Sequence, residues 1–386
     1  MRKRRGRPIA CLGALPDLRS VAAVALGFAF AALPARVAAQ DAPKMVIDED
    51  CQAFDIAADN SIVYAVPHMK RIRQLVIERD DISISAGPGR TRRIVEADKF
   101  MPIPPTAGYV IDSIAWSPDA QRIAVSMSLQ EAPKGFDDKL AKKRGDLDED
   151  NSPLSPVRGP RAIALLDADG REIKVAGSKT RFIENAVQGA WLADNAQVVY
   201  LTGGGPYSIT RIRPADGQTS TLFEGHTFNT VIWDAEKNRA FAIGENLGLH
   251  KGLTLVQLDL VRETVTEIAH IDSYQGSLSL SPSGKKIGFF EDGDYIDVID
   301  VATGARTARV RTGFGRFEWS PDEQRVLLKR GPVDRSNILF WVGLSDGSFT
   351  SILHDLVFHD FRVTPDGKSL AITEPGKRAL KLYALP

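Results

Sequence analysis

Cysteine is scarce in this chain of 386 residues, which contains Cys11 and Cys51 alone. Cys11 lies in an N-terminal segment that we expect to be removed. The remaining chain then has one cysteine, which forms no internal disulfide, so a hydrophobic core must hold the fold. Glu49 and Asp50 precede Cys51, and acidic neighbours disfavour a reactive thiolate. We interpret Cys51 as a strand-start residue, with a reactive thiol as the alternative.

Several signatures of metal sites and catalysis are also missing. The six histidines include no His-x-x-x-His pair, and the sequence has no Cys-x-x-Cys and no Gly-x-Ser-x-Gly. The glycine-rich run at residues 203–206 leads into no helical pattern, so it lacks the helix N-terminus of a phosphate-binding loop. We therefore predict no metal, no cofactor and no catalytic residue.

Apolar runs of membrane-spanning length are absent as well. The apolar run at residues 21–33 has 13 residues, whereas a bilayer core needs about 20. Five basic residues within positions 2–7 precede it and small residues at 35–39 follow it. This pattern is typical of a secretory signal peptide. We expect residues 1–39 to be cleaved off, with a retained anchor as the alternative, and we expect a periplasmic or secreted bacterial protein without stable membrane insertion.

An excess of positive charge is missing from the expected mature chain. The whole sequence has 49 basic and 49 acidic residues, of which seven and one lie in residues 1–39. The mature chain therefore has 42 basic and 48 acidic residues, a net charge of −6. Nonspecific nucleic-acid binding needs clustered positive charge, so we exclude a nucleic-acid partner.

A repeated phrase is the most visible feature that the chain does contain. It is clearest at residues 116–125 (WSPDAQRIAV) and 319–328 (WSPDEQRVLL), and softer copies occur at residues 54–65, 191–200, 233–242, 280–289 and 363–372. Each copy indicates the end of one strand, a tight turn and the start of an apolar strand. From the copy at 116–125 onward, the acid position recurs at intervals of 75, 42, 47, 39 and 44 residues. The seven copies predict seven structural repeats.

Between the copies lie pairs of β-rich runs joined by a glycine turn. Examples are residues 163–175, 209–222, 296–310 and 339–352. Asp-Gly and Thr-Gly supply the positive φ that a hairpin turn needs. Each repeat thus contains four short strands, a to d, and four-stranded units of about 40–50 residues are typical of β-propeller blades. We predict an all-β, seven-bladed propeller of antiparallel blades over residues 40–386.

The last repeat has strands a, b and c but no d. Residues 44–48 (KMVID) precede the first repeat and have no other obvious place. We predict that this N-terminal strand completes the last blade and closes the ring, which removes two exposed sheet edges.

The phrase resembles the PD40, or TolB-like, repeat of β-propellers, a relative of the WD40 type. The resemblance spans residues 45–386 and is most specific at Ser117-Pro118-Asp119, Ser320-Pro321-Asp322 and Thr364-Pro365-Asp366. TolB itself is not expected, because its family has a separate α/β domain ahead of six blades. The related propeller of prolyl-oligopeptidase-like enzymes precedes a hydrolase domain, and this sequence ends with the propeller.

The repeated residues themselves have structural explanations. The prolines preset φ for a turn, and the neighbouring acid can accept backbone N–H groups two residues on. The tryptophans at positions 116, 191, 233 and 319 fall at one position of the innermost strand, so we expect them to pack between blades.

The predicted face that carries the b–c and d–a loops has the more unusual composition. Residues 129–160 form a long, charged b–c insertion in the second blade, which we interpret as a flexible solvated excursion, with a partner-binding arm as the alternative. The b–c loops of the sixth, seventh and first blades are basic, and they contribute Lys329, Arg330, Arg335, Lys377, Arg378, Lys70, Arg71 and Arg73. These cations either form one sector that steers an anionic partner or are scattered solvated charges.

Polar residues four positions before the tryptophan slot mark the start of strand a. Asp112, Asn229 and His359 occupy this position, where they either meet a ligand at the mouth of the central channel or satisfy backbone groups.

The sequence thus predicts a protein that binds another protein or an anionic ligand through its b–c and d–a loop face. The alternatives are a hydrolase or lyase with a small site at the channel mouth, and a non-catalytic accessory subunit of an envelope system.

Overall fold

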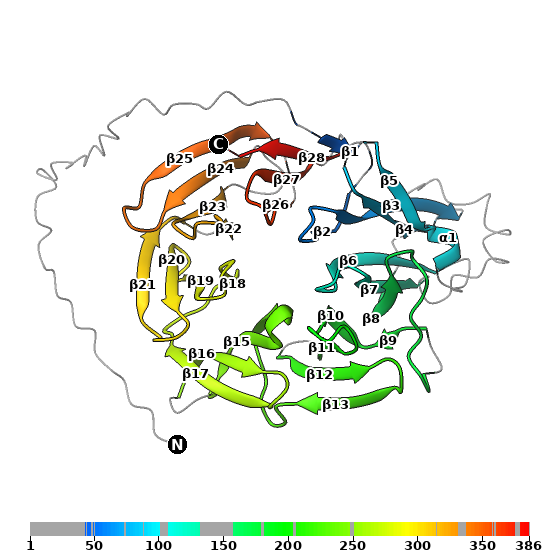
Figure 1. Cartoon of the computed structure of the whole chain (residues 1–386), viewed down its shortest axis with the longest axis horizontal. Helices are drawn as coiled ribbons and strands as arrows, with labels where there is room; N and C mark the ends of the chain where they lie inside the picture. The colour runs from blue at the N-terminus through cyan, green and yellow to red at the C-terminus, as the bar shows by residue number, and fades with distance from the viewer. Residues whose placement is uncertain are drawn as a thin grey trace, which may run out of the picture. The chain divides into compact units, whose positions relative to one another are not determined.

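The computed structural model describes residues 43, 45–47, 49, 51–72, 75–87, 89–100, 107–131, 157–178, 181–203, 206–247, 251–313, 315–330, 337–356, 358, 360–374 and 379–385. All of them belong to one compact unit, Val37–Pro386. Their 28 strands form seven antiparallel sheets of four strands each, arranged as blades around a central axis (Figure 1). The predicted seven-bladed β-propeller is confirmed. The predicted signal peptide, residues 1–39, lies outside the described residues.

The strands of each blade are named a to d from the innermost to the outermost. Blade 1 contains β2 (Phe54–Ile56), β3 (Ile62–Ile72), β4 (Leu75–Ser85) and β5 (Thr91–Val95), and a short helix, α1 (Ala97–Phe100), follows it. Blade 2 contains β6 (Gly108–Trp116), β7 (Arg122–Glu131), β8 (Val157–Asp167) and β9 (Ile183–Glu184). Blade 3 contains β10 (Ala186–Trp191), β11 (Val198–Thr202), β12 (Ser208–Arg213) and β13 (Gln218–Leu222).

The remaining four blades follow the same order. Blade 4 contains β14 (Thr230–Asp234), the 3-10 turn η1 (Ala235–Lys237), β15 (Arg239–Glu245), β16 (Leu253–Asp259) and β17 (Thr264–His270). Blade 5 contains β18 (Ser279–Leu280), β19 (Lys286–Glu291), β20 (Tyr295–Asp300) and β21 (Arg306–Arg311). Blade 6 contains β22 (Arg316–Trp319), β23 (Arg325–Arg330), β24 (Asn337–Gly343) and β25 (Phe349–Leu356). Blade 7 contains β26 (Phe361–Val363), β27 (Ser369–Glu374), β28 (Ala379–Ala384) and β1 (Met45–Ile47).

Burial along the strands explains their sequence patterns. Strands b such as β15, β19 and β23 are buried over nearly their whole length, because neighbouring blades cover both of their faces. A strand buried on both faces has a continuous apolar run rather than an alternating one. The outermost strands β13, β17 and β21 remain largely exposed and are correspondingly rich in Thr, Ser and charged residues.

The ring is closed by the N-terminal strand. β1 pairs antiparallel with β28, with Met45 opposite Leu382 and Ile47 opposite Leu380. Ile47 is buried in a cluster that includes Phe54 of blade 1 and Leu380 of blade 7. The prediction that residues 44–48 supply the fourth strand of the last blade is therefore confirmed in its pairing. This arrangement covers a sheet edge that would otherwise be open.

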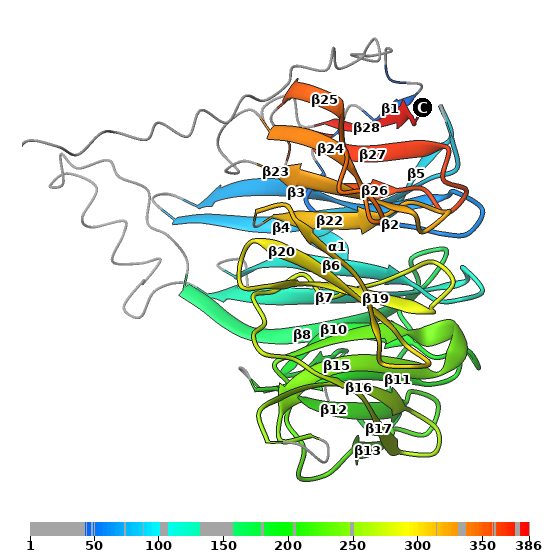
Figure 2. The same cartoon turned by 90° about the vertical axis from the view of Figure 1, so that its left-hand side faces the viewer.

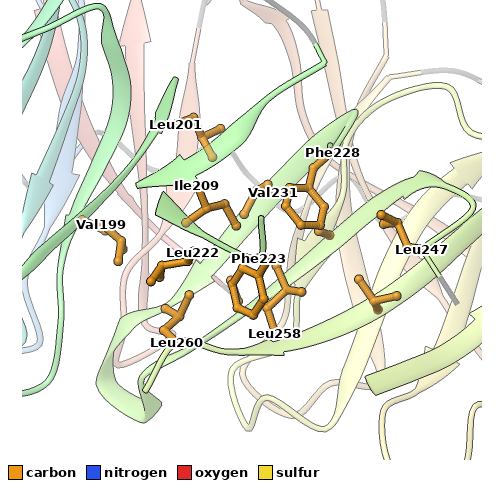
Figure 3. Close-up of a cluster of buried hydrophobic side chains, with 14 of the residues drawn as sticks. Val199, Leu201, Ile209, Leu222, Phe223, Phe228, Val231, Leu247, Leu258 and Leu260 are labelled. Atoms are coloured by element: carbon orange, nitrogen blue, oxygen red, sulfur yellow. The ribbon is translucent and has the colours of Figure 1, made fainter. Parts of the chain in front are cut away.

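Neighbouring blades pack face to face through apolar side chains. Figure 3 shows the cluster between blades 3 and 4, in which Val199 and Leu201 of β11 and Ile209 of β12 lie near Val231 of β14 and Leu258 of β16. All five side chains are buried. Burying an aliphatic side chain of this size stabilises a fold by about 1.5–3 kcal/mol, and seven such interfaces make up the core.

The tryptophans of the repeats lie at these interfaces. Trp191 and Trp319 are 2% and 4% exposed. The indole N–H of Trp233 donates to the Gln188 carbonyl of blade 3 at 2.8 Å, and that of Trp319 donates to a carbonyl of blade 5 at 3.4 Å. Trp116 packs against the cluster shared by blades 1 and 2. The predicted role of these tryptophans in packing between blades is confirmed.

The Ser-Pro-Asp phrase forms the turn between strands a and b. The Ser117 hydroxyl donates to Asp119 at 2.5 Å and accepts the Arg122 N–H at 2.8 Å. The Asp119 carboxylate also accepts the Gln121 N–H at 3.0 Å, as an acid at this turn position is expected to do. The same bonds recur around Ser320, Asp322, Thr364 and Asp366.

One residue of each a–b turn has left-handed backbone. Its φ lies between 50° and 70° in all seven blades, at Asn60, Ala120, Asn195, Asn238, Gly284, Glu323 and Gly367. Non-glycine residues adopt this conformation at a cost of about 1–2 kcal/mol, so Asn and Gly are the expected occupants. Ala120 and Glu323 depart from that preference.

Side chains at this position also connect neighbouring blades. The Glu323 carboxylate accepts the Ser283 N–H of blade 5 at 2.6 Å. Asn238 accepts the Ala193 N–H of blade 3 at 2.9 Å. Asn60 donates to Asp366 of blade 7 at 3.3 Å. The a–b turns therefore tie each of these blades to the one before it.

Deletion of residues 44–48 should lower the melting temperature markedly. The deletion removes the β1–β28 pairing and the buried Ile47, and loss of a buried isoleucine alone costs about 2–5 kcal/mol. Thermal denaturation followed by circular dichroism measures the effect, and deletion of residues 40–42 is the control. An unchanged melting temperature would contradict closure by this strand.

Glycine substitution in the a–b turns should have opposite effects in two blades. Ala120→Gly removes the left-handed strain, so we expect a gain of up to about 1 kcal/mol after the added unfolded-state entropy is subtracted. Glu323→Gly relieves the same strain but loses a charge-assisted hydrogen bond, so we expect a net loss of about 1 kcal/mol. Urea denaturation compares the two variants. Equal effects would show that the Glu323–Ser283 bond contributes nothing.

Candidate functional site

Two neighbouring blades extend beyond the others on the face that carries the b–c and d–a loops, which we call the b–c face. β3, β4 and β8 have 11 residues each and β7 has 10, whereas the other b and c strands have five to seven. Figure 2 shows these strands reaching past the neighbouring blades. Strand structure continues to Glu131 and resumes at Val157, so both ends of the predicted insertion at 129–160 belong to strands. Residues 132–156 lie outside the described residues.

Three of the eight predicted cations have described side chains, and each has a different environment. Lys70 is exposed at the blade 1 hairpin and its ammonium donates to Asp98 at 3.0 Å. Lys329 is 8% exposed and donates to the Phe358 carbonyl at 3.1 Å, so it is a buried cation at the junction of blades 6 and 7. Burial lowers its pKa. Arg330 is exposed at the end of β23.

The other five predicted cations are not described in side-chain detail. Arg71 belongs to β3, and its side chain lies outside the described part of the structure. Arg73, Arg335, Lys377 and Arg378 lie outside the described residues. The basic sector of blades 6, 7 and 1 therefore remains a prediction.

The residues predicted at the channel mouth belong to separate blades. Asp112 of blade 2 is exposed at a bulge in β6, and it accepts the Ser128 hydroxyl at 2.6 Å. A bulge re-aims a side chain relative to its strand. Asn229 is exposed just before β14, and its backbone N–H donates to the Ile243 carbonyl at 2.8 Å. No hydrogen bond joins Asp112 to Asn229 in the described structure, and His359 lies outside it.

Charged side chains follow the innermost strands of blades 6, 7 and 1, and we call them the axial charge row. Arg316 of blade 6 pairs with Asp360, which precedes β26, and with Glu318 at 3.4 Å. Arg362 of blade 7 pairs with Asp55 of blade 1 at 3.1 Å. These five side chains are 20–40% exposed, so solvent reaches them. The innermost strands β10 and β18 contain no charged residue.

The electrostatics of the row favour internal pairing. Burial raises the pKa of Glu318, and the nearby guanidiniums oppose this shift. Burial would lower the pKa of Arg362, but the charges of Asp55 and Glu318 outweigh it and raise the pKa. The second carboxylate oxygen of Asp55 accepts the backbone N–H of Trp116, in blade 2, at 2.9 Å. The row therefore connects blades 6, 7, 1 and 2 around the closing junction.

Buried charges hold the base of the extended blade 1 hairpin. Asp81 is 3% exposed, accepts the Ala97 N–H at the start of α1 at 2.6 Å, and pairs with His68 and Arg93, both at 2.9 Å. Arg79 donates to the Ala107 carbonyl at 2.9 and 3.1 Å. These bonds fasten the connection between blades 1 and 2 to the hairpin. Sequence reasoning missed them, although four charged residues in succession (78–81) within a strand pattern were a signal.

Two cavities lie at the outer rim of the ring. One of about 450 Å³ separates the segment before β9 from blade 3, and Val175, Phe182, Tyr200 and Ile212 contribute to its walls. The other, of about 310 Å³, lies between blades 1 and 2 and is lined by Arg93, Phe100, Leu166 and Arg181 among others. Neither includes a residue that was predicted for the channel mouth.

The described residues contain no group of three or more His, Cys, Asp or Glu side chains that could hold a metal ion. Within the same residues, no helix has the length and apolar character needed to span a membrane.

Comparison with known proteins supports the fold and does not name a family. No protein-family model and no curated protein matches the chain. Among solved structures, a chain in "Crystal Structure of Mitotic Checkpoint Complex" is 14% identical, with a TM-score of 0.54 and 99% of both chains covered. TolB from Acinetobacter baumannii is 12% identical, with a TM-score of 0.37, and the alignment covers 72% of this chain and 80% of TolB. At such identities the first similarity supports the propeller fold alone.

Proposed function

We propose that this protein is an exported interaction platform that binds another protein, or an anionic ligand, through its b–c face. One observation carries the proposal: blades 1 and 2 project long hairpins from that face, beyond the length that ring packing requires. The blade 1 hairpin presents Met69, which is 63% exposed, between the exposed side chains of His68 and Lys70. An exposed apolar side chain with polar neighbours is a common feature of binding surfaces.

The fold itself suits this role. A propeller gathers the loops of all its blades onto two faces of a rigid ring, so binding residues can vary without loss of the core. The a–b turns use their polar side chains for bonds within the turn and to the next blade. The b–c face is therefore the better candidate for a partner. The fold alone does not determine function, which depends on the residues of the b–c face.

The expected partner chemistry follows from the predicted basic sector. Arg330 is exposed, and Arg335, Lys377 and Arg378 would lie near it if the sector forms as predicted. A positive sector on a protein of net negative charge steers an acidic surface or an anionic ligand to one part of the face. The enzyme alternative keeps Asp112 as a candidate residue, and neither of the two rim cavities includes it. The accessory-subunit alternative is compatible with the same face.

Export is proposed from the N-terminal signal pattern. Mass spectrometry of the protein purified from a periplasmic fraction should show a mature chain that begins at Gln40. An intact N-terminus would contradict cleavage, and recovery of the protein from the cytoplasmic fraction alone would contradict export.

Charge reversal on the b–c face should weaken partner binding. Arg330→Glu removes an exposed cation, so we expect roughly tenfold weaker binding at low salt and a smaller salt dependence. Lys285→Glu, at an exposed a–b turn position on the other face, is the matched control. Affinity capture from periplasmic extract, followed by titration of the captured partner, measures the effect.

A second variant tests the hairpins. Deletion of residues 132–156, joined by a short Gly-Ser linker, keeps β7 and β8 intact and removes the segment between them. Loss of the partner with this deletion or with Arg330→Glu, but not with Lys285→Glu, supports the platform. Equal binding by all variants would overturn the assignment to this face.

A further inference from the structure

A fully buried carboxyl group lies at the junction of blades 1 and 2, at the base of the extended hairpin. Asp80 of β4 is 0% exposed. Its Oδ2 accepts the backbone N–H of Ile111, on the innermost strand of blade 2, at 2.6 Å. Its own carbonyl accepts the Tyr109 hydroxyl at 2.7 Å. Asp80 is therefore built into the contact between the two blades.

The second oxygen of this carboxyl group lacks a donor. Oδ1 of Asp80 is buried, and no hydrogen-bond donor among the described residues reaches it. The negative charges of Glu78, on the same strand, and of Asp112, on β6, oppose ionisation of Asp80. A buried acceptor without a donor destabilises the fold, and an ionised one destabilises it more. A proton on Asp80 removes this charge.

We propose that the Asp80 carboxyl group keeps its proton at neutral pH, and that loss of this proton in alkaline solution loosens the blade 1–blade 2 junction and the extended hairpin of β3 and β4. Oδ1, which no described donor reaches, is the oxygen that holds the proton. The protonated group is neutral, so the junction buries no unpaired charge at this position.

The titration behaviour agrees with this geometry. Burial raises the pKa of Asp80 to about 8, the Ile111 N–H opposes the shift, and the negative charges of Glu78 and Asp112 add to it. In the unfolded chain the same group has an ordinary pKa of about 3.9. A carboxyl pKa that is higher in the folded state stabilises the fold at low pH. This stabilisation is lost progressively as the pH rises, and it is gone once the pH passes the folded-state value of about 8.

The other charged groups around the junction have partners of their own. Arg79 bonds to Asp98 and to the Ala107 carbonyl. Asp81 pairs with His68 and Arg93. Two further ionisable groups face Asp80. Asp112 accepts the Ser128 hydroxyl, and the Tyr109 hydroxyl donates to the Asp80 carbonyl. No described cation donates a hydrogen bond to Asp80 Oδ1.

The consequence for binding rests on the proposed function, whereas the protonation of Asp80 does not. Asp80 lies in β4, one of the two strands that form the extended hairpin. If this hairpin contacts a partner, the affinity should fall at alkaline pH along with the stability of the junction. Infrared and unfolding measurements on the isolated protein test the proton without any partner, so the two ideas can fail separately.

Infrared spectroscopy of the full mature chain is the direct test. At pH 7 the spectrum should contain the carbonyl stretch of a protonated carboxylic acid that disappears above pH 9 and is absent from Asp80→Asn. Asp297 of blade 5, whose pKa burial raises to about 7, contributes a second band. The measurement is therefore made in an Asp297→Asn background. Absence of a band that depends on Asp80 at pH 7 would overturn the proposal.

Urea denaturation between pH 7 and pH 9 gives the energetic test. The unfolding equilibrium constant should rise about tenfold over this range in the Asp297→Asn background, and Asp80→Asn should abolish that rise, because an amide does not titrate in this range. Asp272→Asn, an exposed acid, is the control and should keep the rise. An unchanged slope in Asp80→Asn contradicts the proposal. Stabilisation by calcium at pH 9 that depends on Asp80 would also overturn it, since a cation would then fill the site.

Discussion

The closing contact between the two ends of the propeller is the constraint on which the rest of the structure depends. A single four-stranded blade exposes both of its apolar faces, so each blade is stable only between two neighbours. Six of the seven interfaces join blades that follow each other along the chain, and the seventh joins blade 7 to blade 1. There β1 pairs with β28, Asn60 bonds to Asp366, and Arg362 pairs with Asp55. A strand pairing, a bond between a–b turns and an axial ion pair therefore all stabilise the junction of blades 7 and 1.

The architecture could be predicted from the sequence because its signals are local. A turn such as Ser117-Pro118-Asp119 and its glycine-turn counterparts specify hairpins within a few residues, and seven copies specify the number of blades. Closure was predictable because the last repeat lacks a strand. The axial charge row was not predictable, since Arg362 and Asp55 come from opposite ends of the chain. The extensions of β7 and β8 were missed because the end of β7 and the start of β8 adjoin the charged segment and have the composition of a loop. The burial of Lys329 was missed because its partner lies on another blade.

The two faces of the ring use their polar groups differently. On the a–b turn side, carboxylates and hydroxyls accept backbone N–H groups within the turn or from the adjacent blade, so these groups are committed to the fold. On the b–c face, Arg330 is exposed, and β3 and β4 reach past the neighbouring blades (Figure 2). At the base of this hairpin the buried Arg79 and Asp80 bond to the Ala107 carbonyl and the Ile111 N–H. Buried charged side chains therefore join the extended hairpin to blade 2.

The register of the closing strand has a consequence for the order of folding. Met45 leaves the ribosome early and its partner Leu382 leaves it late, so the pairing must wait until nearly the whole chain has been synthesised. Blades 1 to 6 are each built from contiguous sequence, so their strands can pair without waiting for the end of the chain. Until β28 arrives, the first strand has no sheet to join, and a chain that stops early keeps an open edge on which another chain can pair. The closed ring therefore distinguishes a finished molecule from a truncated one.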